Sequence, residues 1–289
     1  MSKQRSKVPF LLRVIPVVFP WLEKFVPPLA NRFFVYIFFT PVRNKVPEKE
    51  KKAESFSTKF TLHIIGKNIQ FYQWGKSSKT VLVVHGWAGR ATQFRRFVKP
   101  LNKAGYQVIG FDGPAHGQSE GRSTNLDEFE QVLQTIVSKT GNVTAIIAHS
   151  FGGAASLYAL TKKLPVPTLI NIASPTIGNE IINTYLRTIG GSSKTGETFK
   201  QYVFKRTGKT FDEYSAMEFI KHIPANLALL LVHDADDKEV SIVHPIELVK
   251  LFPQATMHRT TGLGHTRILK DNQVIQSIVT FIDRHSSKT

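Results

Sequence analysis

The chain has 289 residues, 42% of them hydrophobic, and is long enough to bury a substantial core without covalent cross-links. It contains no cysteine, which excludes disulfides, thiolate zinc sites and a cysteine nucleophile and is typical of a reducing compartment. The formal net charge is +17. The basic residues are nevertheless dispersed, an acidic loop at 234–239 interrupts them and no nucleic-acid-binding motif is present, so we expect no nucleic-acid partner.

The first 55 residues combine bulky apolar side chains with basic ones. Their longest uncharged runs are about ten residues, well short of the ~20 that span a bilayer. A signal peptide is disfavoured because charges and prolines interrupt the first apolar run and no cleavage site follows. We interpret residues 1–55 as a helical arm packed on the domain, ending in a charged linker at 41–55. The alternative is peripheral membrane contact through residues 1–40, so we expect a cytoplasmic protein, membrane-associated under that alternative.

Strands and helices alternate after the linker and predict an α/β fold. Two strands surround a turn at Gly66-Lys67-Asn68, and the strands after them are nearly continuous apolar runs, typical of a mostly parallel sheet with helices on both faces. The expected strands cover 80–86, 106–113, 143–150, 167–174, 227–234 and 255–262, and the expected helices 91–105, 126–137, 153–164, 245–252 and 267–285. Two helices around the polar loop GGSSKTGET break this rhythm at about 176–224, so the domain at 56–289 is expected to carry a helical cap insertion.

Two serine pentapeptides compete for the role of nucleophile. GQSEG (117–121) matches G-x-S-x-G letter for letter, whereas AHSFG (148–152) departs from it at Ala148. The motif stands for a sharp turn between a buried strand and a helix, with small residues beside the serine. Ser150 has the apolar strand VTAIIA before it and the helix GGAASLYAL after it, while Ser119 lies in a loop with neither. We predict Ser150 as the nucleophile and expect Ala148→Gly to keep or raise activity.

Two loops supply the expected acid and base in the order serine, acid, histidine. HDADDKEV follows one apolar strand and TTGLGHTRIL follows the last strand, and both loops open at the same sheet edge as Ser150. We predict His265 as the base and Asp237 as the acid because Asp237 lies farthest into its loop. Asp236 is the alternative, and Asp234 is expected to satisfy backbone groups of the turn. A calcium loop is disfavoured because HDADDKEV lacks the required glycine and the later glutamate. We expect no metal and no organic cofactor.

An oxyanion needs two backbone N–H donors. Phe151, the residue after the nucleophile, is expected to supply one, and Trp87 in the loop HGWAG is expected to supply the other. His85 is the first residue of HGWAG and is interpreted as a hydrogen-bonded scaffold for this loop instead of a base. The same interpretation is given to His116, His149 and His233.

Taken together, these segments resemble the α/β-hydrolase superfamily. The resemblance covers about residues 58–285 and rests on HGWAG, FDGPAHGQSEG, AHSFGG, HDADDKEV and GLGHTRIL in that order. It implies the α/β-hydrolase fold, a structural loop at FDGPAHGQSEG and a helical cap at 176–224. The implied site residues are the nucleophile Ser150, the base His265, the acid Asp237 and the oxyanion donors Trp87 and Phe151. Ala148 and the basic apolar arm depart from the family pattern.

We therefore expect a serine hydrolase that cleaves a small-molecule carboxylic ester or thioester through an acyl-enzyme. The alternative is a non-catalytic member of the superfamily that binds an acyl-like ligand or a partner. The acyl and alcohol specificity and the oligomeric state stay open. Six aromatic residues are expected either to line an apolar pocket or to form the core of the cap: Phe199, Tyr202, Phe204, Phe211, Tyr214 and Phe219.

Overall fold

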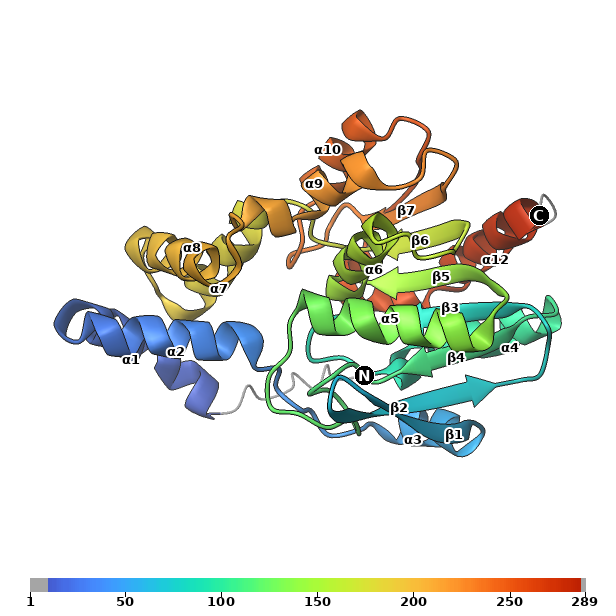
Figure 1. Cartoon of the computed structure of the whole chain (residues 1–289), viewed down its shortest axis with the longest axis horizontal. Helices are drawn as coiled ribbons and strands as arrows, with labels where there is room; N and C mark the ends of the chain where they lie inside the picture. The colour runs from blue at the N-terminus through green and yellow to red at the C-terminus, as the bar shows by residue number, and fades with distance from the viewer. Residues whose placement is uncertain (1–9, 287–289) are drawn as a thin grey trace.

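A computed structural model of the chain describes residues 10–286 and contains one eight-stranded sheet with helices on both faces (Figure 1). The strands lie in the order β1-β2-β4-β3-β5-β6-β7-β8, and neighbouring strands are parallel except in the pairs β1–β2 and β2–β4. Their bounds are β1 Thr58–Ile64, β2 Lys67–Trp74, β3 Thr80–Val84, β4 Gln107–Phe111, β5 Val143–His149, β6 Thr168–Ile172, β7 Ala228–Asp234 and β8 Thr256–Thr260. The predicted α/β fold with a mostly parallel sheet is confirmed.

Helices cover the two faces of the sheet, and each face has its own core. Leu82 and Val84 of β3 pack in one core, while Val81 and Val83 pack in the other, as alternation along a strand requires. The first core includes α5 (Leu126–Thr140), α6 (Phe151–Thr161) and α10 (Val243–Leu251); the second includes α4 (Arg95–Lys103) and α12 (Asn272–Ser286). Because both faces are covered, the central strands β3, β5 and β6 are buried along their whole length and consist mostly of apolar residues.

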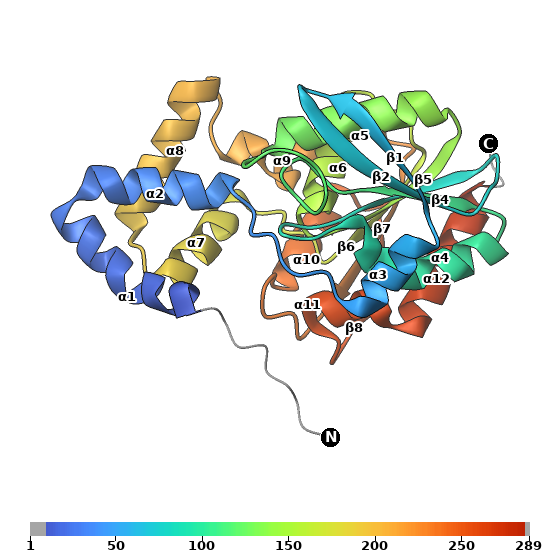
Figure 2. The same cartoon turned by 90° about the horizontal axis from the view of Figure 1, so that it is seen from below.

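Four helices form a separate layer beyond the end of the sheet (Figures 1 and 2). They are α1 (Phe10–Phe25), α2 (Pro27–Phe39), α7 (Gly178–Ile189) and α8 (Ser193–Thr207). Phe19 and Phe34 from the first pair share a core with Leu186 and Phe199 from the second pair. The N-terminal arm therefore packs on the cap helices. Short helical turns, including α9 (Ala216–Phe219), lead back to β7, and none of the described helices is long and apolar enough to cross a membrane.

Two loop predictions were wrong in detail. Most of the polar stretch GGSSKTGET belongs to α8, which starts at Ser193. The side chain of Glu23 on α1 accepts a hydrogen bond from Ser192 N at 3.1 Å, so a residue distant in sequence stabilises this helix start. Residues 48–55 of the expected linker form α3 (Glu48–Ser55). Buried Glu50 anchors that helix, with Arg90 3.6 Å away.

The hairpin turn between β1 and β2 lies one residue earlier than expected. Ile64 pairs with Lys67, so Ile65 and Gly66 form a two-residue turn. Both have positive φ, 50° and 69°, as a type I′ turn requires. The sequence did not predict Ile65 as a turn residue, because β-branched residues rarely adopt a positive φ.

Candidate active site

Ser150 lies on a sharp turn between β5 and α6, with φ 52° and ψ −124°. Positive φ strains a residue that has a Cβ, so neighbouring hydrogen bonds must hold it. Its N–H donates to Ile172 O at 2.9 Å, and its carbonyl accepts from Ser174 Oγ at 2.8 Å and from Gly153 N at 2.9 Å. This strand–turn–helix geometry is that of a nucleophile elbow.

Close packing explains which small residues the elbow needs. A Cβ on Gly152 would lie 2.5 Å from Val84 O, and backbone atoms of a central strand cannot move away cheaply. A Cβ on Gly86 would lie 2.8 Å from the Cβ of Ser150. Ala148 instead sits inside β5, where its methyl is buried in the core. The elbow therefore has a methyl at the first position of the pattern and must keep glycine at the last.

Ser119, the serine of GQSEG, lies in the loop that follows β4. Its side chain is buried, donates to Asp112 O at 2.5 Å and accepts from Gln70 N at 2.9 Å. The hydroxyl therefore uses its donor and one acceptor site to hold the loop against β2.

His265 and Asp237 form a hydrogen-bonded pair. His265 Nδ1 lies 2.7 Å from Asp237 Oδ2, and because a carboxylate only accepts, Nδ1 carries the proton and Nε2 is left as a proton acceptor. Asp237 Oδ1 accepts from Glu239 N at 2.8 Å and from Val240 N at 3.0 Å. Burial raises the pKa of Asp237, but the His265 and backbone hydrogen bonds outweigh it, so the pKa lies below its usual value and the group is a carboxylate at neutral pH.

The other two aspartates tie the two loops together. Asp234 Oδ2 accepts from Leu263 N at 3.0 Å, and Asp236 Oδ2 accepts from Gly262 N at 2.8 Å. Both acceptors therefore hold the backbone of the segment that precedes His265. Within residues 10–286, no group of three or more His, Asp or Glu side chains is arranged to hold a metal ion.

Two buried histidines hold the loops of the acid and the base. His149 Nε2 donates to His265 O at 2.9 Å, and His233 Nε2 donates to Val240 O at 2.9 Å. Burial lowers the pKa of His149 to about 3 and also lowers the pKa of His233, so both rings are neutral at physiological pH. His149, next to the elbow serine, thus fixes the backbone of His265.

His85 links the loop after β3 to the loop after β4, and His116 holds a turn within the loop after β4. His85 Nδ1 donates to Gly86 O at 2.7 Å, and its Nε2 accepts from Gly113 N at 2.8 Å. His116 Nδ1 donates to Pro114 O at 2.9 Å. Burial lowers the pKa of His85 to about 4 and that of His116 to about 3, as a scaffold of neutral rings requires.

The buried neutral histidines make the fold sensitive to acid. Below about pH 6.5 His149 is protonated in the unfolded chain, whereas in the folded protein it stays neutral down to about pH 3. As the pH decreases through this range, the free energy of unfolding therefore decreases by roughly 1.4 kcal/mol per pH unit for that group. We expect His149→Gln, which keeps a donor for His265 O, to reduce the slope of the unfolding free energy against pH, measured by urea unfolding. The reduction should correspond to about one proton fewer taken up on unfolding. Val84→Ala, which destabilises without removing a titrating group, should leave the slope unchanged. Equal slopes for the wild type and His149→Gln would contradict the conclusion that His149 is neutral in the folded protein.

The two expected oxyanion donors lie on different elements: Trp87 is in the loop after β3, and Phe151 is the first residue of α6. Neither Trp87 N nor Phe151 N donates a hydrogen bond to a protein atom within the described part of the chain. The two side-chain rings pack edge to face with their centroids 5.3 Å apart, which brings the two residues together beside Ser150. Both N–H groups are therefore available to a ligand.

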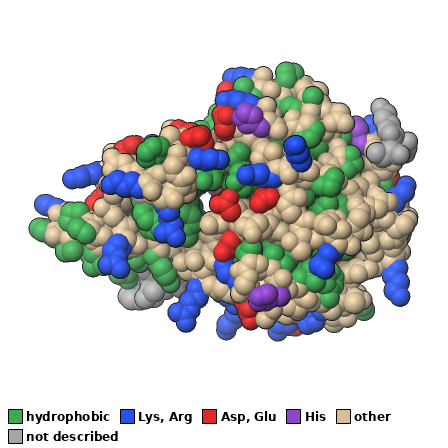
Figure 3. Space-filling view, in the orientation of Figure 1, with side chains coloured by type: hydrophobic (Ala, Val, Ile, Leu, Met, Phe, Trp, Pro, Cys, Tyr) green, Lys and Arg blue, Asp and Glu red, His purple; other side chains and the backbone are tan. Residues whose placement is uncertain are grey.

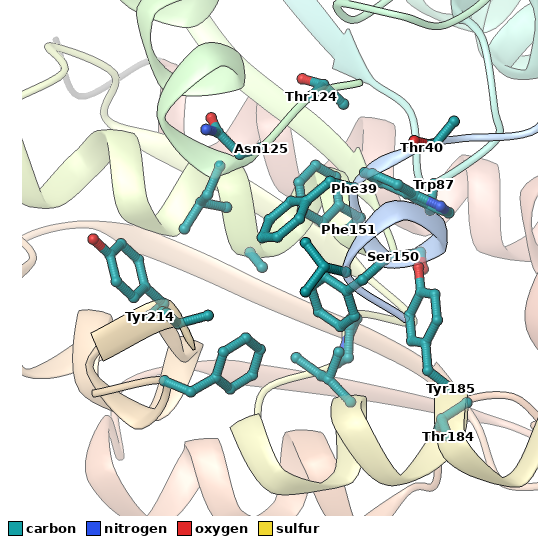
Figure 4. A pocket seen from close by; sticks show the side chains of 18 of the residues that line it. Phe39, Thr40, Trp87, Thr124, Asn125, Ser150, Phe151, Thr184, Tyr185 and Tyr214 are labelled. Atoms are coloured by element: carbon teal, nitrogen blue, oxygen red, sulfur yellow. The ribbon is translucent and has the colours of Figure 1, made fainter. Parts of the chain in front are cut away.

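A cavity of about 590 Å³ lies between the sheet and the layer of α2, α7 and α8, and it is lined by both Ser150 and His265. Figure 4 shows Phe39 from α2 and Tyr185 from α7 among the side chains around Ser150. The size and the aromatic lining are typical of a site for a small, largely apolar ligand.

Both interpretations of the cap aromatics apply. Tyr202, Phe211 and Tyr214 line the cavity. Phe199 is buried in the core of the cap, and Phe219 is buried in a core of the sheet. Phe204 is exposed.

A family model for the α/β hydrolase fold matches residues 79–219, the part of the chain that contains the loop after β3, the turn at Ser150 and the helices α7 and α8. Over that segment, which is just under half of the chain, the sequence matches the α/β-hydrolase superfamily, and the eight-stranded sheet has the corresponding fold. An esterase of Pyrococcus furiosus superposes on it with a TM-score of 0.64, covering 86% of this chain and 99% of the esterase at 20% identity. This likeness concerns the fold alone.

Curated relatives match over shorter segments. The uncharacterized hydrolase YugF of Bacillus subtilis is 28% identical over 116 residues, which is 39% of this chain and 42% of that protein. The dihydrolipoyllysine-residue acetyltransferase component of the acetoin cleaving system of Cupriavidus necator is 28% identical over 126 residues, 43% of this chain and 32% of that protein. The match thus spans less than half the length of each relative.

The sequence did not identify the α2 and α7 residues that line the cavity. Phe38 and Phe39 lie in the N-terminal arm, and Tyr185 lies in the cap. The one signal available was aromatic density, since FFVYIFF in the arm is as aromatic as the cap itself.

Proposed function

We propose that this α/β hydrolase is a serine hydrolase that cleaves carboxylic esters through an acyl-enzyme. The observation that carries the proposal is the hydrogen bond from His265 Nδ1 to Asp237 Oδ2, in a cavity that Ser150 at the elbow also lines. A nucleophile, a base and an orienting carboxylate are the set that acyl transfer needs.

In the first half of the reaction, Ser150 Oγ attacks the ester carbonyl carbon and its proton passes to His265 Nε2. Asp237 stabilises the imidazolium that forms, and the N–H groups of Trp87 and Phe151 hold the oxyanion. His265 then gives the proton to the leaving alkoxide, the carbon–oxygen bond breaks and an alcohol departs.

In the second half, His265 takes a proton from water, which attacks the acyl-Ser150 ester. A second oxyanion forms in the same place, and its collapse releases the carboxylic acid. His265 returns the proton to Ser150 Oγ, so the protein ends as it began.

The charge around the cavity favours an uncharged ester over the thioester of a polyanionic carrier. The lining residues include four acidic side chains and one arginine, namely Asp127, Glu128, Glu180, Glu239 and Arg206. Acidic side chains lie around the hollow at the centre of Figure 3. Glu239 is largely exposed, with its carboxylate 3.9 Å from His265 Nε2. Phosphates brought to this mouth would meet like charge.

A fluorophosphonate probe tests the proposal because it phosphonylates a serine only when a base activates it. We expect mass spectrometry to find one adduct on the folded protein, at Ser150, and none on the denatured chain. Ser123→Ala is the matched control, since Ser123 lines the same cavity away from the elbow and should not affect labelling. A folded protein that stays unlabelled, or carries its adduct elsewhere, would favour a non-catalytic role.

A further inference from the structure

The hairpin of α1 and α2 carries an apolar surface that faces solvent at the far end of the cap. Seven of the fourteen large hydrophobic side chains exposed in the described residues lie within positions 17–36. Val17, Trp21 and Phe25 recur at helical spacing on α1 and are 67%, 64% and 62% exposed. We call Val17, Val18, Trp21, Phe25, Val26 and Leu29 the hairpin patch. Apolar side chains gathered in this way indicate an interaction surface.

The exposed charges beside the hairpin patch are basic. Glu23 is the only acidic residue between positions 14 and 40, and it turns inward to accept hydrogen bonds from Ser192 N and from Thr195 Oγ1, at 3.1 and 2.5 Å. Lys24 and Arg32 are exposed, and Lys24 Nζ lies 5.4 Å from the centre of the Phe25 ring. The hairpin therefore presents apolar and cationic groups to the outside, and its acid is used within the fold.

This pattern fits a lipid surface better than a second copy of the chain. Aromatic and aliphatic side chains suit the boundary between headgroups and acyl chains, while lysine and arginine suit anionic headgroups. A symmetric pairing of two patches would bring the Lys24 and Arg32 of both copies together, which repels.

Helix α2 connects the hairpin patch, which ends at Leu29, to the cavity. Val35, Tyr36, Phe38 and Phe39 line the cavity, and Tyr36 is also exposed to solvent. Figure 3 shows hydrophobic and basic side chains over the end of the molecule that α1 and α2 form. A hairpin resting on a bilayer would therefore hold one wall of the cavity close to the lipid.

We propose that the hairpin patch docks this protein on an anionic lipid surface, with Trp21 and Phe25 at the acyl-chain boundary and Lys24 and Arg32 at the headgroups. The proposal concerns binding and does not depend on the ester chemistry, so Ser150→Ala should bind as the wild type does.

Co-sedimentation of the full chain with vesicles is the first test. We expect binding to vesicles of phosphatidylcholine with phosphatidylglycerol and weaker binding to phosphatidylcholine alone. Trp21→Glu/Phe25→Glu should lower the partition coefficient about tenfold or more, because two large apolar side chains leave the interface. Lys24→Gln/Arg32→Gln should lower it about fivefold for each charge on the anionic vesicles.

A charge-matched control separates the patch from net charge. Phe56→Glu/Leu251→Glu replaces two exposed large hydrophobic residues outside the hairpin and changes the net charge equally, so its binding should equal that of the wild type. The tryptophan fluorescence of the wild type, to which Trp21 contributes, should shift to the blue on binding and be quenched by lipids brominated on their acyl chains.

Three results would overturn the proposal. The first is a wild type that does not bind anionic vesicles. The second is an equal loss of binding in the patch variant and in its charge-matched control. The third is a dimer in analytical ultracentrifugation that Trp21→Glu/Phe25→Glu dissociates, in a protein that vesicles do not bind, because the patch would then serve a second copy of the chain.

Discussion

Ser150→Ala is expected to lower kcat for p-nitrophenyl acetate by about 10⁴- to 10⁶-fold, the range that follows when a nucleophile is removed from a serine–histidine–aspartate set. The alanine retains the backbone hydrogen bonds that hold the elbow, so the chain should fold normally. The elbow φ of 52° strains alanine as it does serine, which makes the comparison one of chemistry. Stopped-flow and steady-state hydrolysis assays measure the loss.

Ser123→Ala serves as the control for this loss. Ser123 lines the cavity but is far from the elbow in sequence, and its replacement should change kcat by less than about threefold. A Ser150→Ala protein that is folded by circular dichroism and still keeps a tenth of wild-type kcat would contradict the assignment of the nucleophile.

The elbow was the most predictable part of the site, because its requirements are local. A buried strand, a serine and a glycine-rich helix start follow one another within a few residues, and the structure places Ser150 between β5 and α6. The letters of G-x-S-x-G favoured Ser119, whose hydroxyl is used within a loop. Local packing favours Ser150: a Cβ on Gly152 would meet Val84 O, whereas the methyl of Ala148 fits in the core.

The wall of the cavity was not predictable, because it depends on contacts between distant segments. The sequence predicts α1 and α2 as parts of an N-terminal arm. Nothing in their own residues indicates that Phe34 packs on Phe199, with ring centroids 5.2 Å apart. That contact places Phe38 and Phe39 at the cavity. The start of α8 was missed for the same reason, since Glu23 from α1 bonds to it.

The choice among the three aspartates lies between these extremes. All three lie within four positions at the end of β7, so the sequence could rank them only by how far each lies into the loop. The turn geometry distinguishes them: Asp237 Oδ1 accepts from two backbone N–H groups of its own loop, which leaves Oδ2 for His265. Asp234 and Asp236 instead accept from the backbone before His265.

Asp237→Asn is expected to lower kcat by about 10⁴-fold at neutral pH, while Asp236→Asn should change it by less than about tenfold. In Asp237→Asn the side-chain amide oxygen can still accept from Val240 N and Glu239 N, which points the amide NH₂ group at His265 Nδ1. Two donors cannot share that contact, so His265 adopts the tautomer with its proton on Nε2 and can no longer accept the proton of Ser150.

Asp236→Asn keeps an oxygen for Gly262 N and leaves the His265 tautomer unchanged. Nitrogen chemical shifts of the labelled imidazole report the tautomer directly. Equal losses of kcat in the two variants, or an Asp237→Asn protein whose proton stays on Nδ1, would remove Asp237 from the triad.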